Sequence, residues 1–359
     1  MSTLRRLILS MLLTSMVSVD AQAQHVPNSR SWYLYFDSQD EVRQYVLEAG
    51  KGPTVVVLHG GFGAEHSYLL DPLLPLTSKR KLVFYDQRGS LRSPAGQLEV
   101  SLPKMVEDLE ALRQQLGEEK LVLLTHSMGG AVAMAYLAKY PDRVRGLVLT
   151  APVLPVSPNN DFKKAPQEPG LLTPAEQEEA DALVAQYWQK QEARLAAVQA
   201  KFKSMPSAAS AEAARATPGY FRNLTEQWRM QFGAVNLYHA ERWPDIDGGK
   251  AFYSQAVADA VFKDPAAVAR QFESFRPALQ AYQGPVEVIL GNEDYCDPGG
   301  YIWNKILKSV PHGRLSLLPE ASHSYWLDQP KASRAALIAA LDRVFADGVA
   351  NKVKNKRGK

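Results

Sequence analysis

Short apolar runs alternate with helical stretches along this chain, and this alternation limits the folds that it can adopt. Four runs in the first part are β-rich and mostly free of polar residues: Thr54 to Leu58, Lys81 to Tyr85, Leu121 to Leu124 and Val144 to Thr150. The last three are separated by two stretches of helical periodicity, Ser101 to Leu116 and Ala131 to Tyr140. Buried strands joined through helices are typical of a parallel sheet covered on both faces. The sequence therefore predicts an α/β fold with a mostly parallel, doubly wound sheet.

The same pattern returns near the C-terminus after a long interruption. We expect strands over Val286 to Leu290 and Arg314 to Leu318, and helices over Gly300 to Ser309 and Ala332 to Phe345. Before the first buried strand, a hairpin is expected from Ser31 to Phe36 and Glu41 to Glu48. Residues 153–283 contain no clear parallel-strand run. We therefore predict one core, built from residues 24–152 and 284–347, with a helical cap inserted over residues 153–283.

The inserted region carries its own helix signals. The stretch Thr173 to Glu176 has the spacing of a capping box with proline at the first helical position, and an amphipathic helix of about 30 residues is expected behind it. Asp264 is expected to cap a helix over Pro265 to Ala281. Further helix is expected over Glu226 to Phe232, and a loop or weak helix over Ser207 to Pro218.

The N-terminal segment has the composition of an export signal. Residues 1–23 combine two early arginines, an apolar stretch from Leu7 to Val19 and the small-residue site Ala21 to Ala23. This order fits a cleavable secretory signal peptide, so the mature chain is expected to begin at Gln24 in a periplasmic or secreted location. An uncleaved anchor is the alternative, although a 13-residue stretch is too short to span a bilayer comfortably.

Charge and cysteine content exclude several classes of protein. The formal net charge is +3, and residues 348–359 alone carry five lysines and arginines. We expect a basic disordered tail there, and the remaining charge gives no reason to expect nucleic-acid binding.

Cys296 is the only cysteine, so no intrachain disulfide can form. The sequence has no zinc motif, phosphate-binding loop or dinucleotide fingerprint, and we expect neither a metal nor another cofactor.

A serine stands at one of the predicted turns from strand to helix. Ser127 lies in the hexapeptide Thr125 to Gly130, which has the form of a nucleophile elbow. Gly129 allows a tight turn that lifts the hydroxyl out of the sheet, and the same turn aims the Met128 backbone N–H at the space in front of it. Thr125 stands where the usual pattern has its first glycine, so an ordinary strand-to-helix turn is the alternative.

Partners for such a serine follow other strands of the predicted sheet. Asp294 follows the strand that ends at Leu290, and His323 follows the last strand. Because the carboxyl ends of parallel strands meet at one edge, these side chains are expected near Ser127. A histidine can take the serine proton and a carboxylate can orient the histidine. Glu293 and Asp297 compete with Asp294 for this role, and Asp297 is also placed to cap the next helix.

Two glycine-containing loops follow the first two predicted parallel strands. In the loop His59 to Gly63, the Gly61 N–H is expected to join that of Met128 as an oxyanion donor. His59 in this loop is expected to be a structural hydrogen-bonding residue. The loop Asp86 to Ser93 is expected to be held by its own Asp and Arg side chains rather than to contact substrate.

Together these segments resemble the α/β-hydrolase superfamily over Ser31 to Ala346, apart from the insertion. The sequences HGGFG, DQRGSLRS and GNEDYCDP are most similar to the prolyl iminopeptidase branch, including the cysteine in the acidic loop. The resemblance implies a triad of Ser127, Asp294 and His323. It also implies an all-helical cap that holds the free amine of the substrate on acidic side chains.

The chain also departs from that branch. Phe62 and Leu91 replace a proline and a glycine, and the elbow sequence THSMGG has the form found in esterases, lipases and C–C bond hydrolases of this fold. Glu226 and Glu241 lie in the region expected to bind a substrate amine, but neither belongs to a motif.

The sequence therefore predicts an exported serine hydrolase that acts through an acyl-enzyme on a small molecule or short peptide. The first hypothesis is an exopeptidase, similar to prolyl iminopeptidase, that releases an N-terminal residue. A carboxylesterase or lactonase acting on small esters is the alternative, and a non-catalytic binding protein on the same fold is a third. The oligomeric state is left open.

Overall fold

The computed structural model describes residues 26–35, 42–96, 100–158, 163–202, 233, 235–245 and 254–357. The predicted signal segment, the loop over Ser207 to Pro218 and the helix over Glu226 to Phe232 lie outside these residues. Among the described residues, no helix is both long and apolar enough to cross a membrane.

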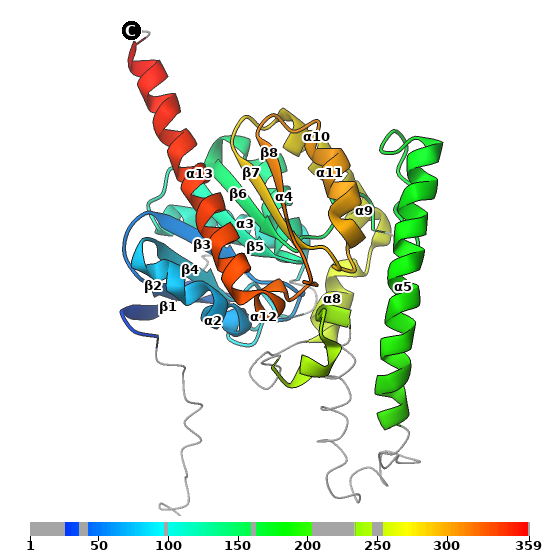
Figure 1. Cartoon of the computed structure of the whole chain (residues 1–359). Coiled ribbons are helices and arrows are strands. Elements are labelled where there is room, and N and C mark those ends of the chain that lie inside the picture. The colour runs from blue at the N-terminus through cyan, green and yellow to red at the C-terminus, as the bar shows by residue number, and fades with distance from the viewer. Residues whose placement is uncertain are drawn as a thin grey trace, which may run out of the picture.

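A mixed, mostly parallel sheet forms the centre of the molecule (Figure 1). Its strands are β1 (Ser29–Tyr35), β2 (Arg43–Ala49), β3 (Thr54–Leu58), β4 (Lys81–Tyr85), β5 (Leu121–His126), β6 (Val144–Thr150), β7 (Val286–Gly291) and β8 (Gly313–Leu318). Their spatial order is β1-β2-β4-β3-β5-β6-β7-β8. The β1–β2 and β2–β4 pairs are antiparallel, and all pairs from β4 to β8 are parallel. This topology confirms the predicted α/β fold and its opening hairpin.

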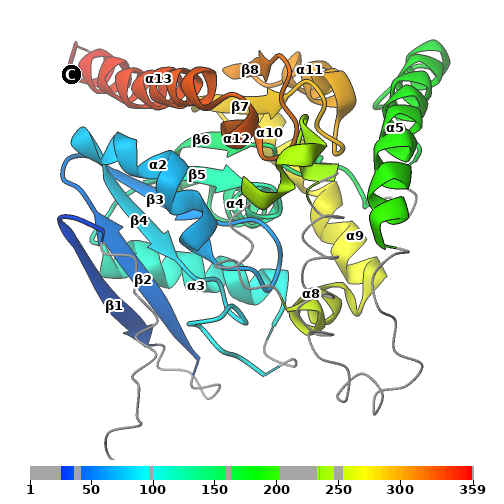
Figure 2. The same cartoon turned by 60° about the horizontal axis from the view of Figure 1, so that its bottom comes forward.

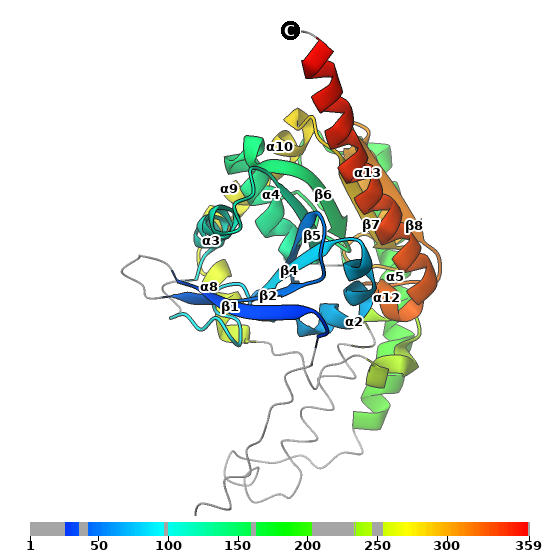
Figure 3. The same cartoon turned by 90° about the vertical axis from the view of Figure 1, so that its left-hand side faces the viewer.

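Helices cover both faces of the sheet (Figure 3). One face carries α3 (Leu102–Gln115), α4 (Gly129–Lys139) and α11 (Tyr301–Leu307), and the other carries α2 (Leu70–Leu73), α12 (Tyr325–Asp328) and α13 (Pro330–Arg357). Neighbouring strand residues such as Val56 and Val57 enter different hydrophobic clusters, one on each face. The strands are therefore apolar without alternation because both of their faces are buried. Short 3-10 turns complete this part: η1 (His66–Leu69), η2 (Leu74–Ser78), η4 (Pro141–Arg143) and η6 (Pro298–Gly300).

Between β6 and β7 the described elements are helical. They are α5 (Pro174–Phe202), η5 (Ala240–Asp245), α8 (Gln255–Phe262), α9 (Pro265–Glu273) and α10 (Phe275–Ala281). The predicted capping box is confirmed, because the Thr173 hydroxyl accepts from the Glu176 N–H and the Glu176 carboxylate accepts from the Thr173 N–H. Asp264 likewise caps α9 by accepting from the Ala267 N–H over 3.0 Å. Figure 2 shows α5 along one side of the molecule, where it contacts η6.

The last part of the insertion packs on a helix that covers the sheet. Helices α9 and α10 pack on α4, and Phe272, Phe275 and Leu279 enter the hydrophobic cluster of that sheet face. Residues of α5 and α8 enter the same cluster, so the cap boundary expected near residue 283 stays a prediction. The helix expected over Pro265 to Ala281 is also broken at Ser274. Pro277 explains this break, because it has no N–H to donate to the Glu273 carbonyl.

The closing helix is longer than the sequence indicated. It was expected to end at Phe345, with a disordered tail over residues 348–359, but α13 continues to Arg357. The tail expectation is therefore wrong for residues 348–357. Alanine, lysine and arginine in this stretch are good helix formers, and Gly348 costs only about 1 kcal/mol relative to alanine, so a helix that the core has already nucleated can continue through it.

Candidate active site

Ser127 occupies a tight turn between β5 and α4. Its backbone φ of 51° is uncommon for a residue other than glycine, as a nucleophile elbow requires. A Cβ atom at Gly129 would collide with the carbonyl oxygens of Leu58 and His59 at the end of β3. The elbow therefore approaches the neighbouring strand so closely that only glycine fits two residues after the serine, as the sequence indicated.

Asp294 and His323 meet at the carboxyl ends of β7 and β8. His323 Nδ1 lies 3.0 and 3.1 Å from the two carboxylate oxygens of Asp294, and both side chains are buried. The backbone N–H of Cys296 also donates to Asp294 Oδ1 over 2.9 Å. Because an ionised carboxylate only accepts hydrogen bonds, the ring proton is assigned to Nδ1, and Nε2 keeps its lone pair.

The two competing carboxylates have other partners. Glu293 forms an ion pair with Lys190 of α5, with 3.3 Å between Oε1 and Nζ. Asp297 accepts from the Ile302 and Trp303 N–H groups and so caps α11. Burial raises the pKa of Asp297 to about 7, although the hydrogen bond from Trp303 opposes this shift. Neither residue is the partner of His323.

His126 connects three parts of this region. The Gly60 N–H donates to the Tyr68 hydroxyl over 2.6 Å, and that hydroxyl donates to His126 Nδ1 over 2.8 Å. The proton of the His126 ring is therefore assigned to Nε2, which lies 3.3 Å from the His323 carbonyl oxygen. Burial, together with the neighbouring His323, holds the pKa of His126 well below its usual value, so its ring is neutral. Sequence reasoning missed Tyr68, which belongs to no motif.

The Ser127 turn adjoins His323 through His126. The rings of His323 and His126 are 4.9 Å apart, and His126 directly precedes Ser127. Among the described residues, the Ser127 hydroxyl and the N–H groups of Gly61 and Met128 make no hydrogen bond to another residue. The structure thus joins Asp294 to His323 directly and places Ser127 at the end of β5, which β6 separates from β7.

Helix α8 packs on both glycine-containing loops. Added Cβ atoms at Gly63 and Gly89 would each meet Val257 of α8, and the Ser254 N–H donates to the Gly63 carbonyl over 2.9 Å. Phe62, which stands where the resembling branch has proline, is buried with its ring 5.8 Å from that of Phe262. The inserted helix and the expected oxyanion loop are therefore one packed unit.

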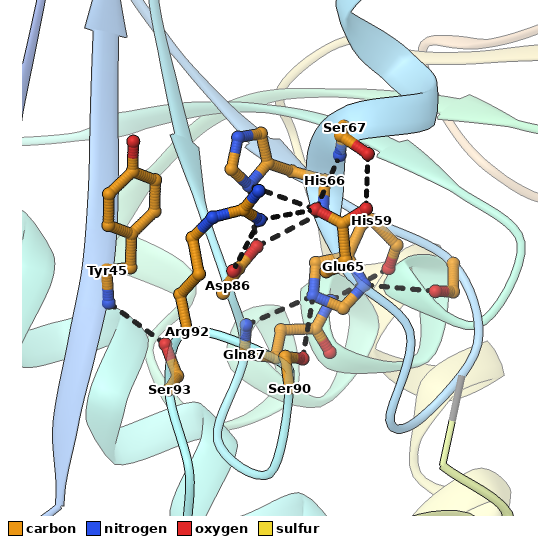
Figure 4. Close-up of polar contacts among 11 residues, drawn as sticks. Tyr45, His59, Glu65, His66, Ser67, Asp86, Gln87, Ser90, Arg92 and Ser93 are labelled. Carbon is orange, nitrogen blue, oxygen red and sulfur yellow. Dashed lines mark hydrogen bonds and ion pairs between the residues drawn. The ribbon is translucent and has the colours of Figure 1, made fainter. Parts of the chain in front are cut away.

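The loop that follows β4 is held by a buried polar network (Figure 4). His66 Nδ1 lies 2.6 Å from Asp86 Oδ1, and Arg92 bridges Glu65 and Asp86 at 2.7 and 3.4 Å. Although burial alone would raise the pKa of Asp86, the hydrogen bond and charge of His66 lower it to about 2. The polar side chains of this loop are thus used to hold it in place, as the sequence indicated.

His59 connects this loop to the glycine loop (Figure 4). Its Nδ1 donates to the Gly60 carbonyl over 3.0 Å, while its Nε2 accepts from the Gln87 N–H over 3.0 Å. Burial lowers the pKa of His59, so the ring stays neutral and keeps this arrangement. The position agrees with the expected structural role.

Two groups in the described part of the chain bring three metal-ligand atoms within 4.8 Å of one another. In the first, Arg92 bridges the Glu65 and Asp86 carboxylates, and His66 is hydrogen-bonded to Asp86. In the second, which adds Cys296 to Asp294 and His323, a metal on Nδ1 would replace the hydrogen bond between Asp294 and His323. Metal binding would thus disrupt hydrogen bonds or ion pairs that the protein already makes.

The two candidates for amine binding gain no support from the structure. Glu226 lies outside the described residues. Glu241 is exposed and pairs with His239 at 3.3 Å, and it has no described contact with Ser127, Asp294 or His323.

The Asp86 network predicts a pH-dependent change in stability. Asp86→Asn should lower the free energy of unfolding by about 2 kcal/mol at pH 7, because the wild-type carboxyl has a lower pKa when folded than when unfolded. This contribution is present above about pH 4 and is lost as the pH falls toward 2. Urea unfolding at pH 7 and at about pH 3 measures it, with the exposed Asp142→Asn as control. An equal deficit at both pH values would contradict the role of this carboxylate charge.

Comparison with known proteins agrees with this fold. A family model described as the alpha/beta hydrolase fold matches residues 53–330, from β3 through α12. The proline iminopeptidase of Saccharolobus solfataricus is 42% identical over 106 residues, but the alignment covers 28% of this chain and 34% of that relative. The chain thus matches about a third of the length of that curated relative.

Two solved structures extend the likeness over most of the chain. The proline iminopeptidase-related protein from Thermus thermophilus has a TM-score of 0.56 at 24% identity, covering 88% of this chain and 98% of that one. A thermophilic esterase from Thermogutta terrifontis has a TM-score of 0.54 at 20% identity, covering 88% and 99%. At these low identities, the two solved structures show only that the fold is the same. The match to the family model shows that the chain is related to that family. The chain belongs to the α/β-hydrolase fold family, and its curated relatives support its resemblance to the prolyl iminopeptidase branch.

Proposed function

We propose that this α/β hydrolase is an exported enzyme with Ser127 as nucleophile, His323 as general base and Asp294 as the residue that orients His323. The buried hydrogen bond between Asp294 and His323, next to the strained turn of Ser127, carries this proposal. Such a constellation is used for acyl transfer, because the histidine can accept a proton on Nε2 only when Nδ1 holds its own.

The geometry suggests the following sequence of steps. Ser127 Oγ attacks the substrate carbonyl carbon while its proton passes to His323 Nε2. The Gly61 and Met128 N–H groups stabilise the resulting oxyanion, and loss of such a donor typically costs about 10²–10³ in turnover. His323 then gives its proton to the leaving group as the bond to the acyl carbon breaks. Water attacks the acyl-enzyme by the same route and restores the Ser127 hydroxyl.

For the substrate we propose a short peptide that loses its N-terminal residue. Curated relatives that match part of the chain are named proline iminopeptidases, which supports the choice. Hydrolysis of small esters is the second candidate, favoured by the HSMGG elbow sequence and by the likeness to an esterase.

A direct substrate comparison tests this proposal. The mature protein should release p-nitroaniline from the prolyl anilide more efficiently than from other aminoacyl anilides, and Ser127→Ala should lower kcat by at least about 10³-fold because the attacking oxygen is lost. Steady-state kinetics with aminoacyl anilides and short-chain aryl esters provide the measurement. Ser309→Ala, which changes a hydroxyl that bonds to a helix carbonyl away from the site, is the matched control.

The outcomes separate the candidates. Ester turnover without any anilide turnover would remove the peptidase proposal and leave the esterase. Activity of Ser127→Ala equal to that of wild type would contradict the triad. If neither substrate class is turned over by wild type, the non-catalytic binding protein becomes the better account.

Export is part of the proposal and rests on the composition of residues 1–23. When the full chain is expressed in a Gram-negative host, the mature protein should accumulate outside the cytoplasm and begin at Gln24, because the small-residue site ends at Ala23. Cell fractionation with N-terminal sequencing measures both. Full-length protein retained in the cytoplasm would contradict export, and full-length protein in the membrane fraction would indicate an uncleaved anchor.

A further inference from the structure

Asp328 bridges the inserted region and the loop that carries His323. Its Oδ2 atom accepts from the Ser322 N–H over 2.9 Å and from the Tyr238 N–H over 3.0 Å. Ser322 directly precedes His323 in the chain, whereas Tyr238 comes from the insertion. One buried carboxylate oxygen thus holds both segments, and no motif in the sequence marks it.

Further hydrogen bonds tie the same two segments together. The Ser324 N–H donates to the Asn236 carbonyl over 2.8 Å, and Arg242 Nη1 donates to the Leu327 carbonyl over 2.7 Å. The Ser322 hydroxyl lies 3.3 Å from the Val235 carbonyl. Polar contacts from the insertion therefore flank His323 on both sides along the chain.

The other side of this loop packs on the elbow. Trp326, which lies two residues before Asp328, has its ring centroid 4.9 Å from that of His126 in an edge-on arrangement. The His323 loop is thus held between the elbow, through an aromatic contact, and the insertion, through hydrogen bonds. A displacement of the inserted segment would therefore move the His323 loop through these hydrogen bonds.

We propose that Asp328 is a positioning residue that couples the inserted cap segment, residues 235–242, to His323. The coupling sets where His323 Nε2 lies relative to Ser127. This inference rests on the proposed role of His323 as the base. A carboxylate suits the task because it can accept two backbone N–H groups on one oxygen, and charged acceptors form the stronger bonds.

The first variant removes the bridge. Asp328→Ala should lower kcat by about 10- to 100-fold with a smaller change in KM, because a displaced base slows the chemical steps more than it weakens binding. Asp328→Asn keeps an amide oxygen that can accept from both N–H groups, and it should restore kcat to within about 5-fold of wild type. Kinetics with the substrate that wild type turns over best, together with thermal unfolding of each variant, provide the measurement.

Matched controls separate positioning from loss of fold. Asp264→Ala removes another aspartate that accepts a backbone N–H in the inserted region, but it does not contact the His323 loop, so its kcat should stay within about 2-fold of wild type. If Asp328→Ala does not fold, Arg242→Ala provides a second test, because it removes a separate hydrogen bond to the same loop. Arg242→Ala should then lower kcat several-fold.

Two results would overturn the inference. One is a folded Asp328→Ala, or in its place Arg242→Ala, whose kcat matches that of Asp264→Ala. The other is a folded Asp328→Asn that is as slow as Asp328→Ala, because the accepted N–H groups would then not be the cause. Ser127→Ala, measured in parallel, keeps the tests distinct: if it retains activity, the proposed function fails, whereas its inactivity with an unaffected Asp328→Ala removes only the coupling.

Discussion

The close approach of the end of β3 to the Ser127 elbow is the constraint on which the rest of the site depends. No side chain fits at Gly129 against the Leu58 and His59 carbonyls, and none fits at Gly60, where a Cβ would lie 2.8 Å from that of Ser127. Because neither glycine has a side chain, the loop after β3 and the start of α4 can pack directly against each other. Among the described residues, the N–H groups of Gly61 and Met128, which follow Gly60 and Ser127 in the chain, make no hydrogen bond to another residue.

Surrounding interactions hold this arrangement from three directions. The network around Asp86 and the neutral His59 ring hold the two loops that follow β3 and β4. Helix α8 of the inserted region packs against both loops. The His323 loop is held against the elbow by Trp326 and toward the insertion by Asp328. Preorganised donors of this kind stabilise charge in a transition state without rearrangement during the reaction.

Elements whose bounds follow from the local pattern of apolar residues were predicted correctly. The bounds of β3, β4 and β6 were predicted correctly because strands buried on both faces are apolar throughout. The packing of Phe275 on α4 was not predicted, because nothing in the local sequence of α10 indicates which helix it will contact. The meeting of Asp294 and His323 could be anticipated from strand order. Tyr68 and Asp328 could not, because each joins a nearby loop to a distant residue, His126 or Tyr238, and neither belongs to a motif.

The central claim is that Ser127 is a nucleophile activated by His323 and Asp294. Reaction with a fluorophosphonate probe, followed by peptide mass spectrometry, tests it most directly because it needs no knowledge of the substrate. The account predicts one adduct per chain on Ser127, strongly slowed in His323→Ala and in Asp294→Ala. Unmodified Ser127 in folded wild-type protein, or an adduct that forms equally fast in His323→Ala, would contradict the account.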